Sequence, residues 1–145
     1  MKHLFYLFVV DTVQYPCQSY NTLRDASRSV LKVGSTYTND ESTNGWYRFV
    51  EKAGSQILDY ETIWQAGVYR CNAKALGWLN GKHPKIADGK VNRTVCFISN
   101  GDKCWYSTWI KIQNCDGFYV YWLKAFSSSQ YMRYCGFGDA GKLES

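Results

Sequence analysis

Two apolar runs in the C-terminal half of the chain predict a β-hairpin. Residues 109–114 read Trp-Ile-Lys-Ile-Gln-Asn, and residues 118–124 read Phe-Tyr-Val-Tyr-Trp-Leu-Lys. Between them stands Asp116-Gly117, which favours a tight turn because Gly adopts positive φ without steric cost and Asp tolerates it. The second run is apolar or aromatic on both faces, which is typical of a central strand that is covered on each side.

Further strands are expected where short apolar or aromatic runs recur, at residues 46–51, 67–71 and 95–99. Clusters of polar residues predict loops at residues 34–44 and 80–84. Strands and turns therefore account for most of the chain.

A second tight turn is expected at residues 99–103, which contain Asn100-Gly101. Such a turn brings Cys96 and Cys104 within bridging distance across a short loop.

The segment 23–30 is expected to form one or two helical turns, with Asp25 and Arg28 at a pairing distance. The 145 residues contain no internal repeat or linker and suit one domain. Aromatic residues make up 17% of the chain and there are only two Met, a composition that favours sheet packing over helical bundles. We expect an all-β or β-rich fold: a small, single, disulfide-stapled domain with an antiparallel sheet or sandwich and short helical turns.

The chain has an even number of cysteines and none of the usual metal-site spacings. No Cys-x-x-Cys pair occurs, and His3 and His83 cannot complete a Cys/His site with good spacing, so we expect neither a metal nor a cofactor. Six free thiols in a cytosolic protein are one interpretation, but three disulfides in an oxidising compartment are favoured. The six cysteines are Cys17, Cys71, Cys96, Cys104, Cys115 and Cys135.

Two further features favour a secreted, extracellular protein. A basic Met1-Lys2-His3 precedes an apolar run at residues 4–10, which is short for a signal peptide and far too short to span a bilayer. Residues 1–14 are therefore either a truncated signal segment or an N-terminal strand. Asn92-Arg93-Thr94 is an N-glycosylation sequon, and no other Asn has Ser or Thr two positions later.

Net charge is +5, and the Lys and Arg residues are scattered along the chain. Nucleic-acid binding would require a basic stripe or a stacking motif, and neither occurs. We expect no nucleic-acid partner.

A series of short motifs gives the chain a family resemblance that covers about residues 15–137. The motifs are Pro16-Cys17-Gln18-Ser19-Tyr20-Asn21-Thr22-Leu23, Gly45-Trp46-Tyr47-Arg48-Phe49-Val50, Arg70-Cys71, Gly77-Trp78-Leu79-Asn80-Gly81 with His83-Pro84, Val95-Cys96, Asn114-Cys115, Gly117-Phe118-Tyr119-Val120-Tyr121 and Arg133-Tyr134-Cys135-Gly136. In this order and spacing they resemble the uromodulin-like cysteine-rich extracellular domain of uromodulin, the pancreatic zymogen-granule glycoprotein and invertebrate mosaic proteins. Residues 138–145 form a polar tail outside it.

The resemblance implies an extracellular domain without catalytic activity, often placed beside zona-pellucida polymerisation modules in larger mosaic proteins. It also implies the pairs Cys17–Cys115, Cys71–Cys135 and Cys96–Cys104, which the residues alone leave open because six cysteines allow fifteen connectivities.

Four cysteine positions of the family are occupied by other residues here. By the family pairing, Asn39 would face Gln130, and Gln65 would face Lys103, so both halves of each bridge are absent together. We expect each pair still to be spatial neighbours. Lys82 stands where a family sequon needs Thr, so only Asn92 is expected to carry a glycan.

Candidate site residues each have a structural alternative. Trp78, Asn80 and His83 could form a binding loop, although a structural turn is favoured there. Residues 45–49 could be an aromatic sugar-binding platform, although core packing on one face is favoured.

No enzyme is expected, because no nucleophile and base pair is apparent. His83 is the only mid-chain candidate base, while Asp88 and Asp116 precede Gly and are typical of turns. Two functions stay open: a non-catalytic extracellular interaction or structural module, and a lectin-like carbohydrate-binding domain. A contiguous exposed aromatic patch beside polar loops would favour the lectin, and the partner would be an extracellular protein or glycan.

Overall fold

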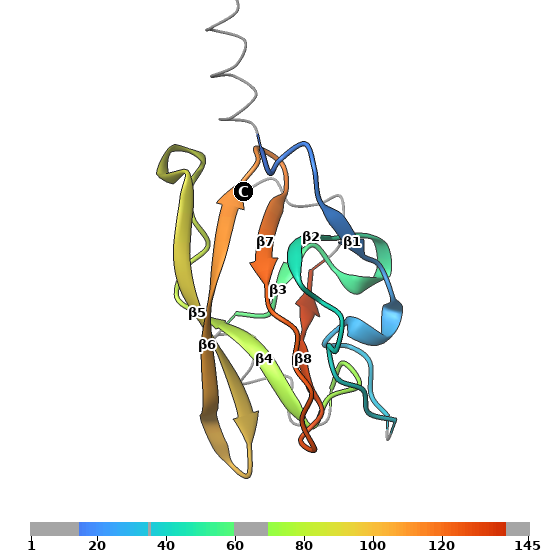
Figure 1. Ribbon diagram of the computed structural model, residues 1–145. Coiled ribbons are helices and arrows are strands. Elements are labelled where there is room, and N and C mark those ends of the chain that lie inside the picture. Colours follow the sequence, from blue (N-terminus) through green and yellow to red (C-terminus); the bar gives the residue numbers. More distant parts are fainter. Residues whose placement is uncertain (1–14, 35, 60–69, 139–145) are drawn as a thin grey trace, which may run out of the picture.

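The computed structural model describes residues 15–34, 36–59 and 70–138, and these form a strand-rich domain (Figure 1). The β-rich fold predicted from the sequence is confirmed, with three disulfides and short 3-10 turns. The strands are β1 (Asn21–Leu23), β2 (Gly45–Phe49), β3 (Gln56–Ile57), β4 (Ala75–Asn80), β5 (Lys90–Ser99), β6 (Asp102–Asn114), β7 (Tyr119–Leu123), β8 (Met132–Tyr134) and β9 (Gly136–Phe137). The 3-10 turns are η1 (Ala26–Arg28), η2 (Glu51–Ala53) and η3 (Ile86–Asp88).

Seven strands form one mixed sheet in the order β1-β2-β7-β6-β5-β4-β8, and β3 pairs with β9 separately. The five strands from β2 to β4 in this order are paired antiparallel, as expected. Both edges differ from the expectation, because β1 runs parallel to β2 and β8 runs parallel to β4. Parallel partners require long connections, which the tertiary fold supplies and which local turn signals do not reveal.

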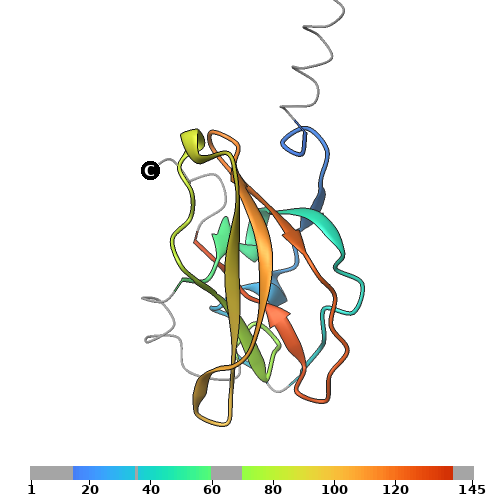
Figure 2. The same ribbon diagram turned by 60° about the vertical axis from the view of Figure 1, so that its left-hand side comes forward.

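Both predicted tight turns are confirmed. Asp116 and Gly117 have φ of 61° and 117° between β6 and β7, and Asn100 and Gly101 have φ of 53° and 79° between β5 and β6. Positive φ at these positions explains the Asx-Gly dipeptides. The β5–β6 hairpin that results runs along the length of the molecule (Figure 2).

Within residues 23–30, η1 provides the single helical turn that was one of the two expected possibilities, and Leu23 before it ends β1. Two other local expectations need correction. Arg28 does not pair with Asp25 as expected, since its guanidinium binds Asp40 instead. The expected strand at 67–71 is a single bridge at Arg70 followed by a turn, and residues 67–69 lie outside the described part.

Two buried clusters lie on opposite faces of the sheet. The larger one contains the inward side chains of β2, β7, β6 and β5, with Phe49, Tyr121 and Phe97 among the largest. The hydroxyl group of Tyr134 closes this core, since it accepts from the Lys124 amide at 3.1 Å and donates to the Lys124 carbonyl at 2.8 Å. The sheet is therefore curled enough for its β8 edge to reach the end of β7.

The second cluster covers the other face over β4 and over the C-terminal end of β5, since Cys96 and Ile98 belong to it. It surrounds Cys71, Cys96 and Cys135 and includes the expected candidate Trp78. Farther along the sheet the same face is exposed or partly exposed, at Asn92 of β5, Trp109 of β6, Trp122 of β7 and Trp46 of β2, and we call this part the open face. Among the described residues, no helical segment is long and apolar enough to cross a bilayer.

Candidate interaction surface

Three disulfides hold the segments that flank the sheet. The pairs are Cys17–Cys115, Cys71–Cys135 and Cys96–Cys104, with Cα–Cα distances of 5.6, 5.7 and 4.7 Å, and they match the pairing that the family resemblance implies. The first joins the N-terminal segment to the end of β6, and the third crosses the β5–β6 hairpin. Crosslinks of this kind restrict the unfolded chain and so stabilise the fold.

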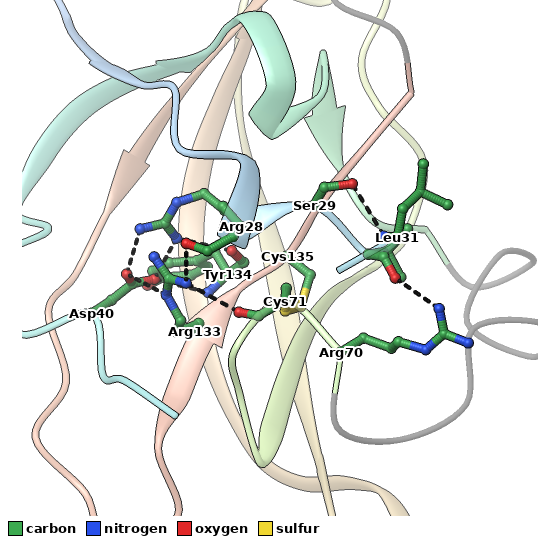
Figure 3. Close-up of a disulfide and its surroundings, with 11 residues drawn as sticks. Arg28, Ser29, Leu31, Asp40, Arg70, Cys71, Arg133, Tyr134 and Cys135 are labelled. Atoms are coloured by element: carbon green, nitrogen blue, oxygen red, sulfur yellow. Dashed lines mark hydrogen bonds and ion pairs between the residues drawn. A yellow bond between two sulfur atoms is a disulfide. The ribbon is translucent and has the colours of Figure 1, made fainter. Parts of the chain in front are cut away.

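A buried charge cluster lies beside the Cys71–Cys135 bridge (Figure 3). Asp40 receives two hydrogen bonds from the Arg28 guanidinium, at 2.7 and 2.9 Å, and the Arg133 Nε lies 3.6 Å from its Oδ1. The carboxylate also accepts from the Tyr134 amide at 2.9 Å. Burial and the neighbouring Arg28 lower the pKa of Arg133, while Asp40 opposes that shift.

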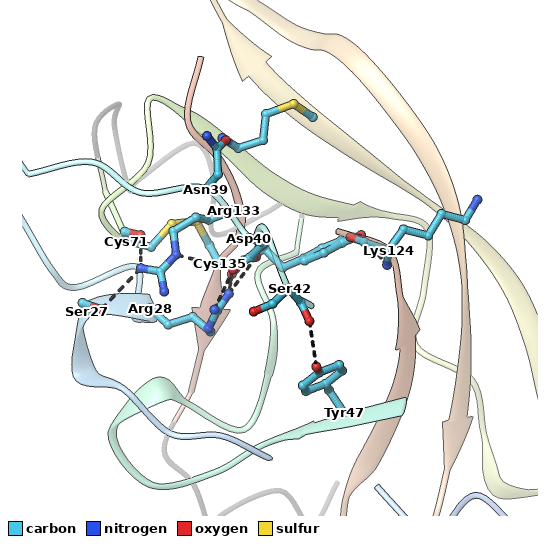
Figure 4. A network of polar contacts seen from close by, with 12 residues as sticks. Ser27, Arg28, Asn39, Asp40, Ser42, Tyr47, Cys71, Lys124, Arg133 and Cys135 are labelled. Atoms are coloured by element: carbon cyan, nitrogen blue, oxygen red, sulfur yellow. Dashed lines mark hydrogen bonds and ion pairs between the residues drawn. A yellow bond between two sulfur atoms is a disulfide. The ribbon is translucent and has the colours of Figure 1, made fainter. Parts of the chain in front are cut away.

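This cluster fixes the 36–44 loop against β8. Arg133 also donates a hydrogen bond to the Cys71 carbonyl at 3.1 Å, which connects the charge cluster to the Cys71–Cys135 disulfide (Figure 4). Asp40 additionally receives a backbone bond from Phe126 and donates one to Met132. Charged groups so deeply buried are stable only when paired, so the cluster is part of the scaffold.

Asn39 stands at one of the replaced cysteine positions and holds the same loop without a bridge. Its side chain donates to the Ser128 carbonyl and accepts from the Met132 amide, both at 2.8 Å. Ser128 and Met132 each lie two positions from Gln130. Asn39 is therefore next to the segment that contains Gln130, its expected neighbour in the family pairing. Gln65 lies outside the described residues.

The structure separates the three residues expected to form a binding loop. Trp78 is buried and donates its Nε1 hydrogen to the Lys103 carbonyl at 2.8 Å. Asn80 is exposed at the end of β4, on the open sheet face. His83 lies on the other face, where its ring packs 4.4 Å from that of Tyr119. They do not form one surface.

His83 is a half-buried part of the core rather than an exposed base. Its Nε2 lies 2.8 Å from the Tyr121 hydroxyl, within hydrogen-bonding distance, and that hydroxyl also accepts from the Ile57 amide. Burial lowers the pKa of His83 from 6.5 to about 4; Asp59 raises it and Arg93 lowers it further. Asp116 lies in the β6–β7 turn, and Asp88 closes η3 through a bond from the Lys85 amide.

The open sheet face carries a cross-strand row of side chains. In register, Trp46 of β2 lies opposite Trp122 of β7, Trp122 opposite Lys111 of β6, and Lys111 opposite Asn92 of β5. Strands lie about 4.8 Å apart, so the row from Trp46 to Asn92 spans about 14 Å. The platform expected at residues 45–49 is thus divided, with Phe49 in the core and Trp46 on the open face.

A second row runs next to the first. Thr94 lies opposite Trp109, which is 48% exposed and stacks on Trp122 with ring centroids 5.6 Å apart and planes at 20°. The Lys124 ammonium lies 3.9 Å from the centre of the Trp109 ring. We call Trp46, Trp109 and Trp122 the tryptophan patch.

The tryptophan patch ends in a shallow hollow of about 360 Å³ with a largely polar lining. Trp46 and Trp122 line it, and the segment that leads into β1 supplies most of the other lining residues. The residues that line it are Tyr15, Ser19, Tyr20, Asn21, Gly45, Trp46 and Trp122. A concave site with aromatic planes and a few polar groups is typical of small-ligand binding.

Sequence reasoning missed the tryptophan patch, although it identified each strand that carries it. Trp46 is far in sequence from Trp109 and Trp122, and the register of β2, β7 and β6 alone places them together. The only signal in the sequence is that Trp recurs at positions that alternate with core residues.

Comparisons with known proteins agree with the motifs. The model of the uromodulin-like domain family matches residues 47–136. The pancreatic secretory granule membrane major glycoprotein GP2 of Canis lupus familiaris is 38% identical over 129 residues, 88% of this chain and 24% of that protein. Uromodulin of Mus musculus is 41% identical over 113 residues, 77% of this chain and 17% of that protein. The chain therefore spans about a quarter or less of the length of these relatives.

Proposed function

Since the chain belongs to the uromodulin-like domain family, as its motifs indicate, we propose that it is a non-catalytic interaction module of a secreted or cell-surface glycoprotein. The observation that carries the proposal is the open sheet face, where three tryptophans lie outside the core and beside a glycosylation sequon. Large apolar groups left at a surface mark interaction sites.

The scaffold is suited to that role. Three disulfides and the buried Asp40 cluster hold the loops that surround the sheet, so the open face is presented on rigid strands. A preorganised surface loses little conformational entropy when it binds. The burial of His83 against Tyr121 supports the proposal of interaction rather than catalysis, since His83 was the candidate base.

Asn92 is proposed to carry the glycan of this module. Its side chain is exposed, and Asn92 and Thr94 both belong to the open face of β5. A glycan at this position would stand at the end of the row that leads through Lys111 to the tryptophan patch.

The test is to secrete the chain from a eukaryotic host, alkylate it after denaturation without reductant, deglycosylate it enzymatically and measure its intact mass. We expect no alkylation and one Asn-to-Asp mass shift, which Asn92→Gln abolishes. Several alkylated thiols would contradict the extracellular assignment, and a missing shift would contradict glycosylation at Asn92.

A second measurement asks whether the tryptophan patch is free for binding. Trp109→Ala removes an exposed ring whose stacking is worth about 0.5–1.5 kcal/mol, so the variant should be secreted and fold with all disulfides. Phe49→Ala, in the core, should instead cost about 3–5 kcal/mol. Equal losses of unfolding free energy would show that the patch belongs to the core.

A further inference from the structure

We propose that the open sheet face binds an acidic oligosaccharide, with sugar rings on Trp46 and Trp122 and a carboxylate at Lys111. This inference rests on the proposed interaction function and names its ligand class. It also decides between the two functions that the sequence left open.

The aromatic geometry fits sugar rings. A pyranose presents apolar C–H groups on its face and hydroxyl groups around its edge, so it packs on an aromatic plane that has polar neighbours. Trp46 and Trp122 are partly exposed neighbours in one cross-strand row, and the nearly parallel Trp109 ring stacks on Trp122. Ring planes held this way lose little freedom on binding.

The hollow beside Trp46 supplies the polar edge. It is lined by two tyrosines, a serine and an asparagine next to the two Trp rings. The Tyr20 hydroxyl accepts from Arg48 at 3.0 Å, which leaves its own hydrogen available to an acceptor. A sugar seated here can therefore both stack and form hydrogen bonds.

The charge on the face selects an acidic ligand over a neutral one. By register, the open-face positions of β2, β6 and β5 include three basic residues, a fourth follows β7 directly, and the paired open-face positions include no Asp or Glu. Lys111 lies opposite Trp122, within one strand spacing of the stacked rings, and Lys124 lies over Trp109. Neither lysine forms an ion pair in the part of the chain that the structure describes. The four residues are Arg48, Lys90, Lys111 and Lys124.

The dimensions of the site also suit an oligosaccharide rather than a single sugar. Trp46 and Lys111 are two strand spacings apart, or about 10 Å, and the hollow extends the surface beyond Trp46. One monosaccharide cannot touch both ends of this row, whereas a chain laid across the strands does.

The experiment compares a hyaluronan hexasaccharide with chitohexaose by isothermal titration at low salt, using the secreted full chain after enzymatic deglycosylation. Both probes contain N-acetylglucosamine and have the same length, but only hyaluronan carries carboxylates. We expect hyaluronan to bind about tenfold more tightly, and added salt to reduce that preference because exposed charges are screened.

Three variants locate the site. Trp122→Ala should weaken hyaluronan binding by about tenfold or more, as expected for an aromatic anchor. Lys111→Gln should bring the two sugars to similar affinity. Trp105→Ala is the matched control, because Trp105 is 40% exposed on the same strand but about 20 Å from Lys111, and it should change nothing.

Absence of hyaluronan binding, equal binding of both probes, or full binding by Trp122→Ala would overturn the inference. Alkylation and circular dichroism are measured on every variant to show that it is folded and that its cysteines are bridged. A failure of the ligand class can then be distinguished from a failure of the proposed function. A chain with all cysteines bridged that binds no sugar refutes the ligand class alone, whereas free thiols refute the extracellular module itself.

Discussion

Asp40→Asn tests the buried charge cluster most directly. The Asp40 side chain is 2% exposed and faces Arg28 and Arg133, whose side chains are 6% and 7% exposed. The substitution keeps the size of the side chain but removes its charge. One of its two acceptor atoms also becomes an NH₂ group, which then faces a donor from Arg28 or the Tyr134 amide.

The expected loss is large because two guanidinium groups are left in the interior without a counter-ion. Breaking a buried ion pair from one side costs about 3–5 kcal/mol, out of a total stability of about 5–15 kcal/mol for an ordinary domain. For a chain of this length we expect the melting temperature to fall by about 10 °C or more.

The assay is urea unfolding of the disulfide-intact protein, followed by Trp fluorescence. Glu51→Gln is the matched control, since Glu51 pairs with Arg24 at the surface with both side chains more than half exposed. That pair should be worth at most about 1 kcal/mol. If the two variants lose similar free energy, or if Asp40→Asn loses less than about 1 kcal/mol, the cluster does not hold the loop and the reasoning fails.

Three other substitutions test the scaffold. Burial keeps the pKa of His83 in the folded protein at about 4. In the unfolded chain the same imidazole binds a proton below about pH 6.5, so the free energy of unfolding should fall by at most about 3 kcal/mol between pH 6.5 and pH 4. His83→Gln retains an acceptor for Tyr121 and should remove this part of the pH slope in a urea series; an unchanged slope would contradict the assignment. Asn39→Ala loses two hydrogen bonds to the backbone and should lower the urea midpoint by the equivalent of about 1–3 kcal/mol, whereas no shift would mean that the loop is held without them. Gly136→Ala should lower the melting temperature, because a Cβ at this position would overlap the carbonyl oxygen of Ala53 in η2. Gly34→Ala is the control, because the added Cβ would have open space around it.

Local turn chemistry made the two hairpins predictable. Asp116-Gly117 and Asn100-Gly101 each require positive φ at adjacent residues, a demand that few dipeptides meet. Alternation along residues 45–49 likewise favoured core packing on one face of that strand. Both inferences depend on neighbours in the chain and need no knowledge of distant contacts.

Contacts between distant segments were the part that the sequence misassigned. Asp25 is the acidic residue three positions from Arg28, yet Asp40 binds it, because the 36–44 loop crosses β8 at that point. The parallel pairing of β1 and β8 likewise depends on long connections. Sequence distance is a poor guide to such contacts, since a long loop costs little more to close than a short one.

By itself, the sequence determined the β-rich class, the two tight turns, the family and, through that family, the cysteine pairs. These follow from residue types and spacings, which act over a few positions or are shared by relatives. Only the tertiary structure decided that Trp46, Trp109 and Trp122 lie together and that Trp78 is buried. Strand register and the covering of one half of a sheet face arise from packing between remote segments, and a row of side chains exists only once those strands are aligned.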